Sequence, residues 1–166
     1  LVDLTVAIEV GVVLAALLFM RRMSEVSQVN AITRDLQDER EEEETTGPKS
    51  VIPDGVEVFE VYGTLFFGAV DQFTESMRSL ESKPKVLILE TKNLLAVDAT
   101  GLRALDELVY QLSQQKTHFL LSGIHKQPLF AMQQSGLLDR LGEDNVCGGL
   151  DEALQRAKTL TDQKAV

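Results

Sequence analysis

The sequence predicts a mixed α/β domain over residues 51–166, preceded by an apolar helix and a charged linker. Short apolar runs alternate with amphipathic stretches after residue 51, as strands and helices do when they succeed one another along a chain. Residues 4–20 are almost entirely apolar, and the glutamate run 41–44 separates them from the domain. We therefore divide the chain into the end of a membrane helix (1–22), a partly helical charged linker (23–50) and a domain (51–166).

The apolar segment, LTVAIEVGVVLAALLFM, is predicted to be the end of a transmembrane helix. A bilayer core of about 30 Å needs roughly twenty helical residues, so the segment just reaches across if residues 1–3 are included. Arg21 and Arg22 predict that the chain after them is cytoplasmic. Because the charges come after the apolar run, a secretory signal peptide is disfavoured, whereas a buried soluble helix remains the alternative. Glu9 should face other helices of a bundle.

The linker is expected to begin as a continuation of this helix and to end as a solvated tether. Val26, Val29, Ile32 and Leu36 recur at helical spacing. The adjacent carboxylates of residues 41–44 repel one another, which favours an extended chain in water.

Within the domain, the apolar pattern predicts strands joined by amphipathic helices. Strands are expected at 56–62, next to an edge, at 85–91, in the centre, at 119–121 and at 145–147. Helices are expected over the apolar stripes of residues 70–80 and 102–112, over 128–135 with Gly136 after its end, and over 150–160.

The composition excludes several classes of function. With 16 Lys plus Arg against 26 Asp plus Glu, the net charge of −10 disfavours nucleic acid as a partner. A single cysteine, Cys147, excludes an internal disulfide, and two histidines, His118 and His125, are too few for a usual zinc site. Ser122 and Gly123 lack the frame of a nucleophile elbow. We expect no enzyme, no metal site and no cofactor.

The most informative motif comes after the central strand, where residues 94–97 lead into Asp98-Ala99-Thr100-Gly101-Leu102. Asp98 is placed to accept the N–H of Thr100 or Gly101 as a helix N-cap, and Gly101 permits close approach of another backbone or a ligand. Thr100 is then expected to be exposed at the positive end of the helix dipole, where a phosphoryl group would be well placed.

These five residues resemble the Asp-Ser-Ser-Gly turn of STAS domains, which occur in bacterial anti-sigma-factor antagonists and in the cytoplasmic tails of SulP-type anion transporters. Two further segments are similar to SulP proteins. Residues 52–56 with 62–69 resemble the first strand and turn of the tails, and residues 3–23 resemble the last membrane helix.

The resemblance implies a STAS-like fold, with a small mixed sheet and about four helices. It also implies a secondary transporter for sulfate, bicarbonate or a related anion, whose transport site lies upstream of this chain. The phospho-acceptor position of the antagonists falls on Thr100, with Asp98 as its acidic neighbour. Ala99 and Thr100 depart from the two serines of the motif, and simple helix capping by Asp98 and Thr100 is the alternative.

The chain is accordingly interpreted as the regulatory or assembly tail of a transporter in the cell membrane, with its domain on the cytoplasmic side. The partners implied are its own transmembrane domain, the membrane, a second copy in a homodimer and a possible regulatory protein. Phe66 and Phe67 cannot both point to one face of a strand, so one is a candidate contact with the membrane domain or a partner, and ordinary core packing of both is the alternative. The rival interpretation is a membrane-tethered signalling module of the antagonist type, switched by phosphorylation at Thr100.

Overall fold

The structure, a computed structural model, describes residues 4–26, 28–31, 52–65, 75 and 83–162. The expected helix over residues 70–80 and the Phe66–Phe67 pair lie outside the described residues, apart from Glu75, which is helical and exposed. The described helices are α1 (Leu4–Val26), α4 (Ala99–Gln114), α5 (Lys126–Gln134), α6 (Leu137–Leu141) and α7 (Leu150–Asp162), with a short 3₁₀ turn η1 (Glu143–Asn145). The strands are β1 (Gln28–Ala31), β2 (Val56–Leu65), β3 (Val86–Glu90), β4 (Leu94–Val97), β5 (His118–Ser122) and β6 (Val146–Cys147).

The strands form a mixed sheet, as the resemblance to STAS domains implied. Their order is β1-β2-β3-β5-β6, and β4 pairs with the far end of β2 from Gly63 onward. β1 runs antiparallel to β2, whereas β2, β3, β5 and β6 are parallel neighbours. The carboxyl ends of the parallel strands therefore meet at one edge of the sheet, where α4 and α5 begin.

The burial of the strands matches their apolar patterns. All five residues of β3 are buried, which confirms a central strand covered on both faces. In β2 the half-buried Glu57 and Glu60 interrupt buried residues, and β1 alone separates this strand from the edge. β5 and β6 confirm the two shorter strands expected near residues 120 and 146.

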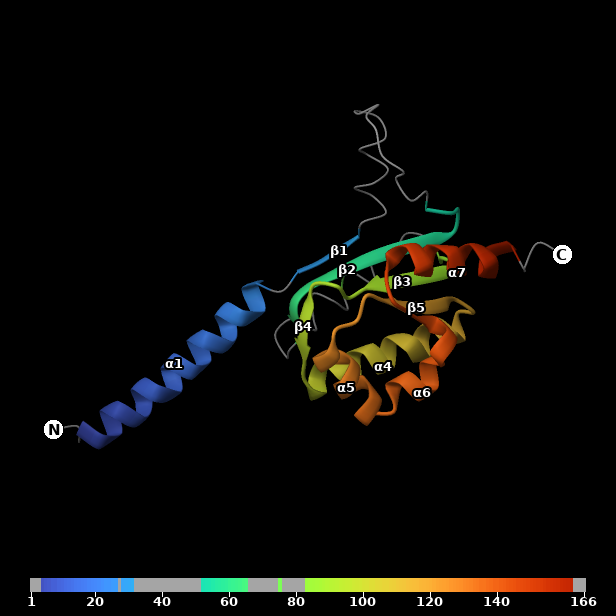
Figure 1. Cartoon of the computed structure of the whole chain (residues 1–166). Coiled ribbons are helices and arrows are strands. Elements are labelled where there is room, and N and C mark those ends of the chain that lie inside the picture. The colour runs from blue at the N-terminus through green and yellow to red at the C-terminus, as the bar shows by residue number, and fades with distance from the viewer. Residues whose placement is uncertain (1–3, 27, 32–51, 66–74, 76–82, 163–166) are drawn as a thin grey trace, which may run out of the picture.

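Helices cover both faces of the sheet (Figure 1). On one face, α4, α5 and α6 contribute Leu105, Met132 and Leu137 to the larger apolar cluster. On the other face, α7 packs Leu154 and small alanines against β3 and β5. Burial of a leucine side chain stabilises the fold by about 1.5–3 kcal/mol, so these two clusters fix the positions of the helix ends.

The linker departs from the sequence expectation. The helix does continue past Arg22, but it ends at Val26, and Gln28–Ala31 form an edge strand rather than further helical turns. The helical interpretation of Val29 was therefore wrong. Each residue of β1 is in register with one of β2, from Gln28 opposite Tyr62 to Ala31 opposite Phe59. The edge of β2 offers backbone partners to an extended chain, and this tertiary pairing outweighs a weak helical periodicity.

Besides β1, the short elements β4, α6 and η1 were not expected. α6 begins directly after Gly136, which has a left-handed φ of 72° and lies just past the end of α5, as the sequence predicted for a glycine at that place. β4 occupies the apolar approach to the motif turn.

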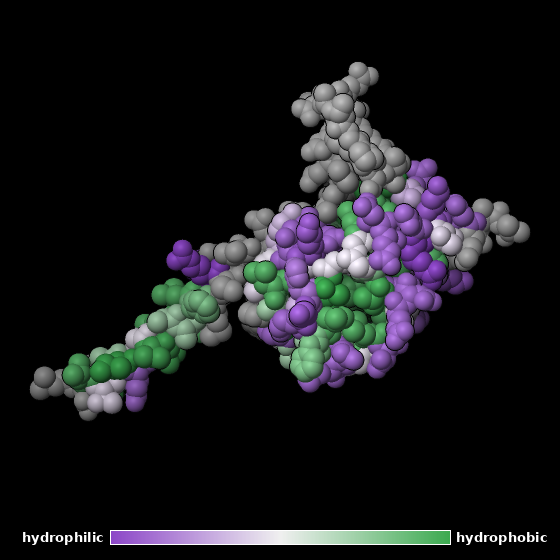
Figure 2. Space-filling model, viewed as in Figure 1, coloured by the Kyte–Doolittle hydropathy of each residue, from purple (hydrophilic) through white to green (hydrophobic). Residues whose placement is uncertain are grey.

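α1 projects away from the domain (Figure 1), and apolar side chains line it (Figure 2). Its large apolar residues between Leu4 and Phe19 are 47–74% exposed, and Glu9 is exposed as well. Among the residues that the structure describes, no helix has both the length and the apolar character needed to cross a membrane.

Candidate functional site

The motif turn, residues 98–102, joins β4 to α4 through a side-chain cap. Asp98 has an extended backbone and is the N-cap of α4; its Oδ1 accepts the N–H of Gly101 at 2.8 Å. The N–H of Leu102 donates to the Asp98 carbonyl at 2.9 Å, which starts the helical hydrogen bonds. The cap predicted from the sequence is confirmed, and of the two donors considered the structure selects Gly101.

Gly101 is required by its contact with the end of β2. A Cβ at this position would lie 2.1 Å from the carbonyl oxygen of Leu65 and 2.8 Å from Cγ2 of Val97. The same Leu65 carbonyl accepts the N–H of Asp98 at 3.4 Å. The first turn of α4 is thus packed directly on the backbone of β2. Of the two possibilities predicted for Gly101, close approach of another backbone is the one observed.

Thr100 occupies the second position of α4, where the N–H groups lack helical partners and the dipole is positive. It is half-buried, so the expectation of an exposed hydroxyl was wrong in degree, while Ala99 beside it is exposed and Leu102 is half-buried. Within the described part of the chain, the Thr100 hydroxyl makes no hydrogen bond. A phosphoryl group on this oxygen would sit between the helix N-terminus, which favours it, and the Asp98 carboxylate, which repels it.

A side chain that sequence reasoning missed holds the turn from its other side. The amide oxygen of Gln127, in the first turn of α5, accepts the N–H of Val97 at 3.2 Å. Because β4 pairs only with β2 among the described strands, this bond satisfies a donor on the opposite edge of β4. No local pattern in the sequence marks Gln127, which lies thirty positions from its partner.

A second set of polar residues that the sequence analysis did not identify lies at the ends of β3 and β5. Glu90 is only 5% exposed; its Oε2 accepts the Ser122 hydroxyl at 2.7 Å and its Oε1 accepts the N–H of Lys92 at 3.0 Å. Thr91 donates its hydroxyl to the Ser122 carbonyl at 2.7 Å. The available signal was a glutamate that ends an otherwise apolar strand, because a buried carboxylate needs specific donors.

Glu60, opposite Glu90 in the β2–β3 register, binds the next residues along this edge. Its Oε1 accepts Asn93 Nδ2 at 2.6 Å and its Oε2 accepts the Tyr62 hydroxyl at 2.7 Å. The hydrogen bond to Glu60 raises the pKa of Tyr62 above its ordinary value of 10.0, because it stabilises the protonated phenol. The bond to Asn93 joins β2 to the β3–β4 connection.

The weaker candidates are dispersed over the fold. His118 is exposed at the start of β5, and exposed His125 places Nε2 2.6 Å from the Lys92 carbonyl oxygen. Cys147 is buried, and this burial raises the pKa of its thiol, with Glu152 adding to the effect. Among the described residues, no cluster of three or more His, Cys, Asp or Glu side chains could hold a metal ion.

Comparison with known proteins identifies the fold and its relatives. The family model described as STAS domain matches residues 48–153. A Bacillus subtilis protein named as a sulfate transporter is 26% identical over 154 residues, which are 92% of this chain and 27% of that protein. The chain therefore spans about a quarter of the length of this curated relative.

Solved structures agree with the family match. A sulfate transporter family protein from Wolinella succinogenes is 36% identical, with a TM-score of 0.65 over 71% of this chain and 96% of the other. An anti-sigma factor antagonist from Mycobacterium paratuberculosis shares the fold at 19% identity, with a TM-score of 0.54 over 69% of this chain and 99% of its own.

Proposed function

The chain belongs to the STAS domain family, and from that premise we propose that it is the C-terminal part of a SulP-type secondary transporter for sulfate, bicarbonate or a related anion. One observation supports this above others: the likeness to the Bacillus subtilis protein named as a sulfate transporter covers 154 residues, more than the segment 51–166 contains. It must therefore include residues upstream of the domain. The antagonist matches only 69% of this chain.

In this proposal α1 is the end of the last membrane helix. Its exposed apolar side chains would be covered by lipid and by the helices of the transport domain, which would also keep Glu9 away from lipid. Arg21 and Arg22 are exposed near the end of this helix, a placement that favours a cytoplasmic position for the domain.

The domain itself would support folding, homodimer assembly or regulation of the transport domain. The motif turn and the Phe66–Phe67 pair are the proposed contact regions. Leu65 precedes that pair directly and packs its carbonyl on the first turn of α4, so a contact at residues 66 and 67 would be transmitted to the motif turn. Neither region needs to touch the transported anion.

The test is anion uptake by the full-length protein in proteoliposomes, with sulfate, bicarbonate and dicarboxylates as substrates. We expect saturable uptake of one of them. Deletion of residues 51–166 should reduce uptake, dimer content or membrane insertion. Absence of uptake by folded protein would contradict the transporter, and a deletion that changes none of the three properties would remove the role of the domain.

The second candidate is a membrane-tethered signalling module in which phosphorylation of Thr100 is the switch. The position of Thr100 at the start of α4 and the fold shared with the antagonist favour it. A phosphate would add about −1.5 to −2 charges beside Asp98. Anion uptake separates the two candidates, because a signalling module would take up no anion. If uptake is present, Thr100→Ala and Thr100→Glu variants test regulation: a regulatory Thr100 changes the uptake rate at constant protein amount, whereas a helix-capping Thr100 leaves it unchanged.

A further inference from the structure

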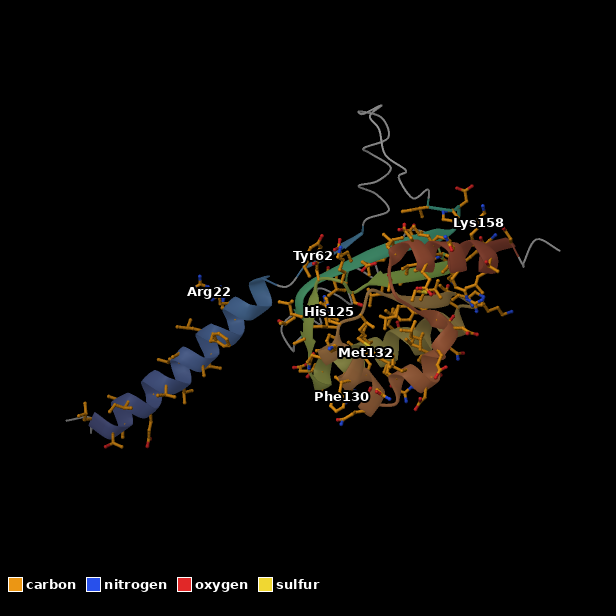
Figure 3. The ribbon with its side chains drawn as sticks, in the orientation of Figure 1. Arg22, Tyr62, His125, Phe130, Met132 and Lys158 are labelled. Atoms are coloured by element: carbon orange, nitrogen blue, oxygen red, sulfur yellow. The ribbon has the colours of Figure 1, made fainter. Side chains whose placement is uncertain are left out.

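One side of the domain presents exposed basic and apolar side chains together. We define the β4–α5 surface as Lys92, Leu95, His125, Lys126 and Phe130, all of which are exposed. Lys92 lies in the β3–β4 connection, Leu95 in β4, His125 directly before α5, and Lys126 and Phe130 in α5. Figure 3 labels His125 and Phe130, which lie on the α1 side of the domain.

This surface lies at the end of the sheet from which α1 leaves. β1 comes almost directly after α1, and its first residue, Gln28, is in register with Tyr62 of β2. The next residue of β2, Gly63, donates its N–H to the Asn93 carbonyl at 2.9 Å. The C-terminal end of α1 and the β3–β4 connection are therefore held side by side through β2.

Two side-chain contacts then hold the β3–β4 connection and β4 against α5. His125 Nε2 lies 2.6 Å from the carbonyl oxygen of Lys92, and Gln127 binds the N–H of Val97. The elements that carry the β4–α5 surface therefore contact one another, and through β2 they are connected to the C-terminal end of α1. Figure 1 shows β4 and α5 on the side of the domain toward which α1 extends.

The chemistry of the surface is amphipathic and positive. Leu95 is 67% exposed and Phe130 is 60% exposed, although large apolar residues are usually buried. Lys92 and Lys126 bring positive charge to this side of a chain whose net charge is −10. The nearby Glu90 carboxylate is buried and accepts the Ser122 hydroxyl, so it is not itself part of this exposed surface.

We propose that the β4–α5 surface rests on the anionic headgroup layer of the membrane that holds α1. Leu95 and Phe130 would insert among the lipid headgroups, and Lys92 and Lys126 would lie beside their phosphates. Arg21 and Arg22, exposed near the end of α1, would add positive charge at the same membrane interface. This inference rests on the proposed function, because it requires α1 to be in a membrane. It adds that anionic lipid orients the domain.

The test compares full-length protein in vesicles of phosphatidylcholine alone with vesicles that also hold about one third phosphatidylglycerol. The readout is the rate at which a membrane-impermeant maleimide labels Leu95→Cys, measured at that peptide by mass spectrometry. Tyr110→Cys is the matched control, because Tyr110 is 62% exposed but belongs to α4, outside the surface. We expect Leu95→Cys to be labelled up to about 25-fold more slowly in the anionic vesicles, since each of the two lysines at such a surface contributes a factor of roughly five.

Replacing both lysines, Lys92→Gln with Lys126→Gln, should abolish this difference, and Tyr110→Cys should react equally in both lipids. Equal labelling of Leu95→Cys in both lipids would overturn the inference. So would slow labelling in both lipids that persists without the lysines, which would assign the surface to a protein partner such as the transport domain.

A further variant separates this inference from the proposed function. Leu14→Cys reports directly on α1: free labelling would show that α1 is outside the membrane and would overturn both. Protection at Leu14 together with saturable anion uptake, but without lipid-dependent protection at Leu95, would leave the transporter intact and refute only the membrane-facing surface.

Discussion

Gly101→Ala tests whether the motif turn is built on direct contact with β2. The added Cβ would lie 2.1 Å from the Leu65 carbonyl oxygen and 2.8 Å from Val97 Cγ2, and the first of these partners is backbone. Ordinary contacts of this kind need well over 3 Å, so α4 must shift or β2 must bend. Overpacking of this kind costs about 1–3 kcal/mol, and a backbone partner places the cost at the upper end.

An opposing effect reduces this cost. Alanine is better than glycine inside a helix by up to about 1 kcal/mol, but the third helical residue realises only part of that gain. We therefore expect a net loss of about 2 kcal/mol in the free energy of unfolding, or a melting temperature lower by roughly 5–10 °C.

The assay is urea unfolding of residues 51–166, monitored by circular dichroism. This fragment is reasonable because 96% of the solved Wolinella succinogenes chain is covered by 71% of this chain, about the share that residues 51–166 make up. Gly149→Ala is the matched control: a Cβ there meets no atom within 4 Å, so its stability should be unchanged or slightly higher. A Gly101→Ala domain as stable as this control would refute the close-contact reasoning.

Three further changes test other parts of the structure. Asp98→Ala removes the cap on the Gly101 N–H and should cost about 1 kcal/mol in urea unfolding, whereas Asp98→Asn should retain most of it; equal losses would argue against capping. Glu90→Ala leaves the buried Ser122 hydroxyl without its acceptor and should cost about 2–3 kcal/mol, more than Glu90→Gln, and the reverse order would contradict the hydrogen-bonded pair. Because the folded-state pKa of Tyr62 is raised, its bond to Glu60 stabilises the fold below pH 10.0 and is lost as the pH rises through the raised value. The stability gap between wild type and Tyr62→Phe should therefore be under about 1 kcal/mol at neutral pH and shrink above pH 10.0, and a gap that grows in alkali would count against this bond.

The domain could be predicted well where one local rule governed the outcome. The apolar run at β3 allowed only a central strand, and the apolar stripe of α4 allowed only a helix packed on the sheet. Asp98 and Gly101 were predictable for the same reason, since an N-cap and a close-approach glycine act within a few residues of their own position.

The prediction was wrong where a distant partner decided. Val29 lies at helical spacing from the apolar residues Val26 and Ile32, but its backbone pairs with Val61 of β2 in a sheet. Thr100 was expected to be exposed, yet it is half-buried, because exposure depends on how α4 sits against the rest of the fold. Local propensity is worth only a fraction of a kcal/mol per residue, which a ladder of hydrogen bonds readily exceeds.

The sequence by itself determined the α/β class, the positions of the main strands and helices, and the cap that begins α4, because periodicity and capping are properties of neighbouring residues. Only the tertiary structure decided which polar groups meet across the sheet: Gln127 with Val97, Glu90 with Ser122, and Glu60 with Asn93. It also placed β4 and α5, which carry the exposed Leu95, Lys126 and Phe130, on the side of the domain toward which α1 extends. These partners lie about thirty positions apart along the chain, and no local preference encodes a contact over that separation; it arises when parallel strands bring their carboxyl ends to one edge.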